Sequence, residues 1–232
     1  MSTQQLRRPR SDVTSNPIPP GAHTWAGASA IAAMAALALI VGVILADRQI
    51  DPSWRFISEY QLGVWGGFMS LAFLALSVSA CFLVAALHSQ VATPSGRVGL
   101  GVLTVSAAGF LLAGAFRTDP VDASVGSLSG FVHSIAAMLG GLVPLAAFLI
   151  AWSLARNIAW RPYRRSLRWI TTVAILANIA SITQQIIMGI GGGFGPGVPL
   201  GWPNRAFVLL LGGWLLAAAL LVRTASRKVT HG

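Results

Sequence analysis

The chain has 232 residues, of which 55% are hydrophobic and only 9% are charged, and its formal net charge is +10. Soluble globular domains average about 25% charged residues, so this composition excludes an ordinary soluble protein and indicates one built for a membrane. A single cysteine excludes an intramolecular disulfide and a cysteine-based metal site. No cofactor-binding motif is present, and we expect no bound cofactor.

Residues 1–24 are rich in Ser, Pro and Arg, cannot bury a core, and are predicted to form a disordered basic tail. Six apolar runs follow, each long enough to cross the ~30 Å hydrocarbon core as a helix. They form a predicted transmembrane domain over residues 25–223, followed by a short tail over residues 224–232. Pro144 predicts a kink in the fourth run. The runs are Trp25–Ala46, Val64–Leu87, Arg97–Ala115, Phe131–Leu154, Leu167–Ile190 and Pro203–Val222.

The predicted fold class is therefore all-α, an integral membrane bundle of six transmembrane helices. Positive charge alternates between the connecting segments, because one set holds twelve of the 16 basic residues and the other holds five of the six acids. Lys and Arg are retained on the cytoplasmic side, so we expect both termini to be cytoplasmic and the acidic loops to face outward. The expected location is the cell membrane.

The basic residues flank the apolar runs and do not form a soluble basic face. This distribution predicts anionic lipid headgroups at the cytoplasmic face as partners, and it argues against nucleic acid. A membrane-protein partner is a second candidate. The sequence does not indicate an oligomeric state.

Four short polar motifs lie at the ends of the runs that face outward in this topology. They are ISEYQLG (57–63), FRTDP (116–120), GFVH (130–133) and PNR (203–205). In order and position these motifs resemble a bacterial membrane family catalogued as domain of unknown function 998. The resemblance covers the membrane region and implies a six-helix architecture without an established reaction. The glycine-rich segment 189–201 departs from the family's usual form.

Three residues in these motifs supply the types needed for nucleophilic catalysis. Ser58, Asp119 and His133 correspond to a hydroxyl nucleophile, an orienting carboxylate and a general base. Ser58 lacks the glycine-flanked turn that presents a nucleophilic serine, and its alternative role is a local hydrogen bond at the helix entry. No metal site is expected, because the other histidines lie on the cytoplasmic side or in the tails. The sequence favours a non-catalytic role without settling it.

Charge pairing is the leading interpretation of the outward-facing charges. Arg117 and Arg205 can pair with acids at the same depth and so close the outer end of the bundle; these acids are Glu59, Asp119 and Asp122. The same arginines could instead hold a lipid phosphate or a substrate carboxylate, because guanidinium binds both through two parallel hydrogen bonds.

The fifth run carries a stripe of uncharged polar residues. Thr171, Asn178 and Gln185 recur every seven residues and therefore share a helix face, with Ser181 nearly on the same side. The simpler interpretation is hydrogen bonding between helices. The alternative is a polar cavity that opens to the outside.

Together these features predict a multi-pass membrane protein that binds lipid or a membrane partner through an outward-facing polar cluster. A small transporter or channel is one alternative, although no acid lies deep in a run and no inverted repeat is evident. An intramembrane hydrolase or transferase acting on lipid at the outer leaflet is the other. The candidate binding residues are Glu59, Arg117, Arg205, Asn178 and Gln185.

Overall fold

The computed structural model describes residues 18–190 and 195–230, and this part of the chain is helical with no β-strand. Six helical stretches are long and apolar enough to cross a membrane, which confirms the predicted all-α architecture with six spans. In chain order the elements are α1 (Pro20–Ala46), η1 (Ile57–Leu62), α2 (Gly66–Leu87), α3 (Pro94–Ala115), α4 (Leu128–Gly140), α5 (Val143–Leu154), η2 (Ile158–Tyr163), α6 (Arg164–Ile190) and α7 (Gly201–Thr230).

The boundaries differ from the sequence prediction mainly at the two ends of the chain. Helix α1 starts at Pro20, inside the segment predicted as a disordered tail, and α7 runs to Thr230, through most of the predicted C-terminal tail. Residues 1–17 of the predicted tail lie outside the described residues, as do residues 191–194 of the glycine-rich segment. Proline early in a helix is well tolerated, which explains how α1 begins at Pro20.

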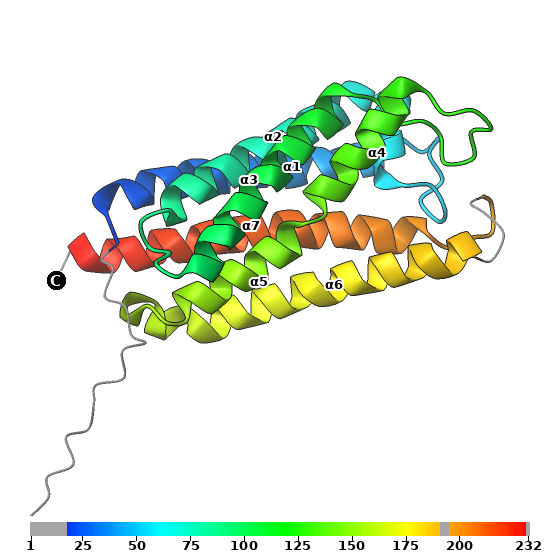
Figure 1. Cartoon of the computed structure of the whole chain (residues 1–232). Helices are drawn as coiled ribbons and strands as arrows, with labels where there is room; N and C mark the ends of the chain where they lie inside the picture. The colour runs from blue at the N-terminus through cyan, green and yellow to red at the C-terminus, as the bar shows by residue number, and fades with distance from the viewer. Residues whose placement is uncertain (1–17, 191–194, 231–232) are drawn as a thin grey trace, which may run out of the picture.

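The helices form one elongated bundle in which neighbours in sequence are mostly neighbours in space (Figure 1). Helix α1 packs against α2 and α7, and α2 packs against α3. Helix α6 packs between α5 and α7 and so closes the ring of spans. Only 17% of the most apolar window of the α6 span is buried, against 33% to 50% for the other five spans, so α6 is the most peripheral helix.

The fourth span is broken, as Pro144 predicted. Helix α4 ends at Gly140 and α5 begins at Val143, because proline has no backbone N–H to continue the helical hydrogen bonds. The break changes the neighbours of the span: α4 packs mainly on α3, whereas α5 packs on both α3 and α6.

Small side chains allow α1 to approach its neighbours closely. Its buried face carries alanine at one- and two-turn intervals, and Ser29 meets Ser79 of α2 there. Each of these serines donates its hydroxyl to the other's backbone carbonyl, at 2.9 and 3.0 Å. Lipid is as apolar as the helix surfaces, so no hydrophobic driving force brings transmembrane helices together. They associate instead through close contact between small residues and hydrogen bonds across the interface. The buried alanines are Ala22, Ala26, Ala30, Ala33 and Ala36.

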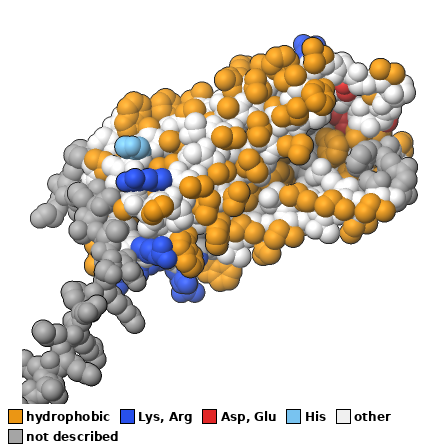
Figure 2. Space-filling view, in the orientation of Figure 1, with side chains coloured by type: hydrophobic (Ala, Val, Ile, Leu, Met, Phe, Trp, Pro, Cys, Tyr) orange, Lys and Arg blue, Asp and Glu red, His pale blue; other side chains and the backbone are white. Residues whose placement is uncertain are grey.

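The two ends of the bundle differ in charge. Most Lys and Arg side chains visible in Figure 2 gather at one end, the acids gather at the other, and hydrophobic side chains cover the face between them. We call the first the basic end; it includes residues 88–93 and 155–168. The acidic end consists of residues 47–65, 116–127 and 195–204. The apolar band between two polar ends matches the cross-section of a bilayer.

A buried polar network closes the basic end. The indole Nε1 of Trp160 donates to the side-chain oxygen of Gln90 at 2.9 Å, and the Asn157 amide donates to the Gln90 carbonyl at 3.2 Å. All three residues are buried. The network ties the segment between α2 and α3 to η2.

Close packing of α3 on α4 gives a direct test of this fold. A Cβ at Gly109 would lie 2.5 Å from the backbone nitrogen of Gly140 and 2.7 Å from the Ala136 carbonyl. We expect Gly109→Ala to lower the free energy of unfolding by about 1–3 kcal/mol, because backbone atoms cannot move aside as a flexible side chain can. Thermal unfolding of the detergent-purified protein measures the change.

The matched control is Gly101→Ala on the same helix, where a Cβ would meet nothing within 4 Å. This variant should be as stable as the wild type or slightly more so, because alanine favours the helix over glycine. Equal destabilisation by the two substitutions would contradict the packing of α3 on α4.

Candidate functional site

Polar residues from all four motifs meet at the acidic end, where they tie together residues 51–63, 116–133 and 201–205; we call this assembly the cap. Several hydrogen bonds in the cap run from a side chain to a backbone group of another segment. The polar side chains of the motifs therefore hold separate segments of the chain together.

Glu59 is the centre of the cap and is fully buried. Its Oε2 accepts from Arg55 Nη1 at 2.6 Å and from the Val121 backbone N–H at 3.3 Å, and its Oε1 accepts from the Phe56 N–H at 2.8 Å. A buried carboxylate is tolerated only when it is paired and hydrogen-bonded, and Glu59 meets both conditions. Its bonds join η1 to the loop that follows α3.

Arg55 is the arginine that pairs with the acids. Besides Glu59 it reaches Asp122, with Nη2 at 3.3 Å from Oδ2. The sequence prediction that Arg117 and Arg205 make these pairs is wrong for the described residues, in which the salt bridges are those of Arg55. Arg117 is exposed. Its carbonyl accepts from the Ser129 hydroxyl at 2.8 Å. The spacing of four residues between Arg55 and Glu59 is the signal that could have identified the pair from sequence.

Arg205, in the first turn of α7, is 2% exposed and bonds to backbone, not to an acid. Its Nη1 donates to the carbonyls of Pro52 at 3.1 Å and Arg55 at 2.7 Å. The guanidinium carbon lies 5.1 Å from the Tyr60 ring centroid and 6.0 Å from that of Trp202. Its Nε and Nη2 are buried and have no hydrogen-bond partner.

Two amide side chains that the sequence did not single out also hold the cap. Asn204 Oδ1 accepts from the Ile57 N–H at 2.8 Å and so fixes the start of η1 to α7. The buried Gln61 donates to the Ala113 carbonyl at 2.8 Å and accepts from the Thr118 N–H at 3.2 Å. Both lie within the quoted motifs, but an amide in a motif gives no signal of which backbone group it will meet.

Asp119 organises the turn into α4. Its two oxygens accept from the backbone N–H and the hydroxyl of Ser127, at 2.6 and 2.8 Å. These bonds, first that of the backbone N–H and then that of the hydroxyl, lower the pKa of the Asp119 carboxyl. The Ser127 hydroxyl in turn accepts from the Gly130 N–H and caps the helix. A Cβ at Gly130 would overlap the Asp119 carboxylate, so glycine is required for this approach.

His133 is buried one turn further along α4. Its Nδ1 lies 2.8 Å from the Phe116 carbonyl, and because a carbonyl only accepts, Nδ1 carries the hydrogen. The Phe73 ring packs edge-on against the imidazole, and the buried Nε2 has no hydrogen-bond partner. Ser58 is half-buried, and no hydrogen bond among the described residues joins Ser58, Asp119 and His133. The geometry does not assemble them into a nucleophile–base pair.

A family model described as "Protein of unknown function (DUF998)" matches residues 9–221. The chain belongs to this family. No curated protein and no solved structure matches it. The four motifs behind the resemblance meet in the cap of this DUF998 protein, whereas the family match itself runs over most of the chain.

No group of three or more His, Cys, Asp or Glu residues among the described residues of the DUF998 chain is placed to hold a metal ion. The polar stripe of α6 bonds locally and to α7. Thr171 accepts from the Trp214 indole at 3.2 Å, and Gln185 donates to the Ser181 hydroxyl at 3.1 Å. Asn178 is half-buried. The Thr171–Trp214 bond joins α6 to α7, as the simpler interpretation predicts, whereas the Gln185–Ser181 bond stays within α6.

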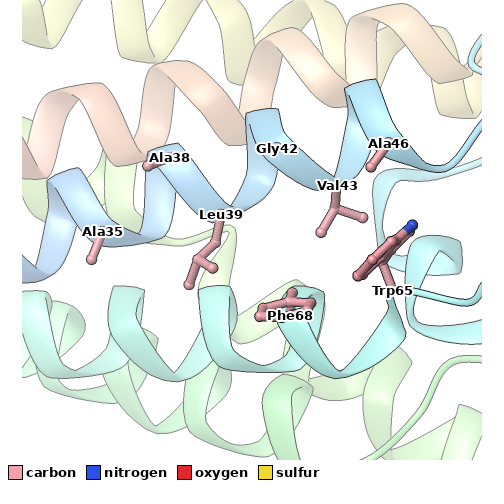
Figure 3. A pocket seen from close by; sticks show the side chains of 8 residues that line it. All are labelled: Ala35, Ala38, Leu39, Gly42, Val43, Ala46, Trp65 and Phe68. Carbon is pink, nitrogen blue, oxygen red and sulfur yellow. The ribbon is translucent and has the colours of Figure 1, made fainter.

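A shallow apolar groove lies between α1 and α2 in the half of the bundle next to the acidic end, with a volume of about 510 Å³ (Figure 3). The side chains of Leu39, Val43, Trp65 and Phe68 point into the space between the two helices. The lining has no charged group, so the groove suits a hydrocarbon chain and not a polar ligand. Its residues are Ala35, Ala38, Leu39, Gly42, Val43, Ala46, Trp65 and Phe68.

The Arg55–Glu59 pair gives the sharpest stability test of the cap. Glu59→Gln removes the buried negative charge and leaves Arg55 beside an amide, so we expect a loss of roughly 3 kcal/mol in the free energy of unfolding. Thermal or denaturant unfolding in detergent measures it. The matched control is Asp122→Asn, which removes the exposed partner of the same arginine and should cost less than about 1 kcal/mol. Equal losses would contradict a cap centred on Glu59.

Proposed function

We propose that this protein binds a membrane lipid at its acidic end without transforming it chemically. The observation that carries the proposal is a polar cap, most of whose groups already have partners, surrounded by exposed apolar side chains. Glu59 and Asp119 have both oxygens bonded within the chain, which leaves them poorly suited to acid–base catalysis. The exposed rim consists of Leu62, Val64, Trp65 and Trp202.

The rim and the groove together provide the two environments that an amphiphile needs. Tryptophan side chains prefer the boundary between headgroups and hydrocarbon, because the ring is apolar and the indole N–H is polar. Trp65 belongs to both features: it is part of the rim and it lines the apolar groove between α1 and α2. The cap and the groove therefore lie at adjoining depths in the membrane, so one lipid could place its headgroup at the cap and its hydrocarbon chain along the bundle.

The proposal places the acidic end outside the cell membrane and both termini in the cytoplasm. The unequal distribution of arginine supports this orientation, because Lys and Arg near span ends are retained in the cytoplasm. Lipid at the cap would then come from the outer leaflet.

The orientation can be tested by cysteine labelling in a Cys81→Ser background. Ser124 lies exposed in the loop after α3 and Ser89 lies exposed after α2, at opposite ends of the bundle. A membrane-impermeant maleimide added to intact cells should label Ser124→Cys and not Ser89→Cys, and lysed cells should show both. Labelling of only Ser89→Cys in intact cells would reverse the orientation.

Lipid binding can be tested by native mass spectrometry of protein purified from its own membrane. We expect a retained lipid, reduced several-fold by Trp202→Ala because the rim loses its exposed ring, and unchanged by Arg156→Gln at the basic end. Ser58→Ala should also retain the lipid intact. Absence of any retained lipid would contradict the proposal. It would also be contradicted if the wild type converted an added lipid and Ser58→Ala abolished that conversion.

A further inference from the structure

Arg205 is a buried cation that forms no salt bridge among the described residues. Its guanidinium is 2% exposed, yet among the described residues its hydrogen bonds go to two backbone carbonyls and to no carboxylate. Glu59 holds Arg55 and Asp119 holds Ser127. Asp51 bonds to Ser53 and interacts with the charge of Arg205 from a distance, without a hydrogen bond to it. A buried cation is normally stabilised by a directly hydrogen-bonded counter-charge, and Arg205 leaves Nε and Nη2 available for one.

The unbonded part of Arg205 has the geometry of an anion-binding fork. Both carbonyl bonds use Nη1, so Nε and Nη2 remain, and these two atoms carry parallel N–H groups on one edge of the planar guanidinium. That edge matches the spacing of two oxygens of a phosphate or carboxylate, which it binds through two parallel hydrogen bonds. Carbonyl bonds on the opposite side hold the plane in a fixed orientation.

Aromatic rings form the walls of this site. Tyr60 is buried and lies 5.1 Å from the guanidinium carbon, whereas Trp202 lies 6.0 Å away and is 58% exposed. Tyr60 therefore lies buried beside the guanidinium, and Trp202 lies on its exposed side, where a ligand would approach. Ring faces also stabilise the guanidinium by cation–π attraction, which helps it to persist before a ligand arrives.

We propose that Arg205 binds a phosphate oxyanion through its Nε and Nη2 edge, between Tyr60 and Trp202. This inference rests on the proposed function and specifies the ligand chemistry: the headgroup of the bound lipid carries the phosphate. Free phosphate has the same chemistry and is the alternative source. The cap at the membrane boundary supports the lipid source, because phospholipid phosphates lie at that depth.

The test compares three ligands on detergent-purified protein in phosphate-free buffer, with binding measured by calorimetry. The ligands are dioctanoyl phosphatidic acid, dioctanoylglycerol and inorganic phosphate. The wild type should bind the phosphatidic acid roughly 10- to 100-fold more tightly than the phosphate-free lipid, which is the range expected for a charge-assisted bond. Arg205→Lys keeps the charge and can still reach the carbonyls but lacks the planar edge, and it should lose most of this preference.

Arg48→Lys is the matched control, because Arg48 is an exposed arginine at the same end of the bundle and belongs to none of the candidate sites. It should keep the wild-type preference. If Arg205→Lys does not fold, Arg205→Gln replaces it, since an amide can also donate to the two carbonyls. Equal affinity of the wild type for both lipids would overturn the phosphate inference and leave lipid binding intact. An unchanged preference in Arg205→Lys would overturn the assignment to Arg205.

The remaining outcomes separate this inference from the proposed function. If inorganic phosphate binds through Arg205 and neither lipid does, the phosphate site stands and lipid binding fails. If none of the three ligands binds, both fail.

Discussion

The burial of one carboxylate constrains the whole acidic end. Glu59 has no access to water, so its oxygens must find donors within the chain, and they find them on Arg55 and on the backbones of Phe56 and Val121. Those donors fix η1 against the loop after α3. They also set the Arg55 carbonyl where the first turn of α7 can reach it through Arg205. One buried charge thus determines how three separate segments meet.

The two central carboxylates of the cap are fully bonded within the chain, whereas Arg205 and His133 keep buried nitrogen atoms without a partner. A catalytic acid or base needs a polar atom directed at substrate, and the carboxylates of Glu59 and Asp119 are directed at the protein. Arg205 differs because its backbone bonds use only part of its donor set. Under the proposed function, the cap is a rigid frame that presents a cation, and the apolar rim and groove hold the hydrocarbon part of the bound lipid.

The features that depend on local composition, namely the spans and the break in the fourth span, were predicted from the sequence. The side-chain pairs that join different spans were not. Hydropathy and length determine a span, so all six were predicted, and Pro144 marked the break between α4 and α5 because the missing N–H is a local property. Depth in the membrane also follows from position along a span, so the motifs were placed at one end. Position around the bundle does not follow from sequence, and for that reason Arg205 was paired with acids that it does not meet. The backbone contacts of Asn204 and His133 gave no sequence signal.

The central claim is that Glu59 is saturated within the chain while Arg205 presents a free edge to an oxyanion. A crystal structure of the protein grown in a phospholipid mesophase tests it most directly. The account predicts both Glu59 oxygens bonded within the chain and phosphate density within hydrogen-bond distance of Arg205 Nε and Nη2. A carboxylate of the chain on that edge of Arg205, or a Glu59 side chain turned toward solvent, would contradict it.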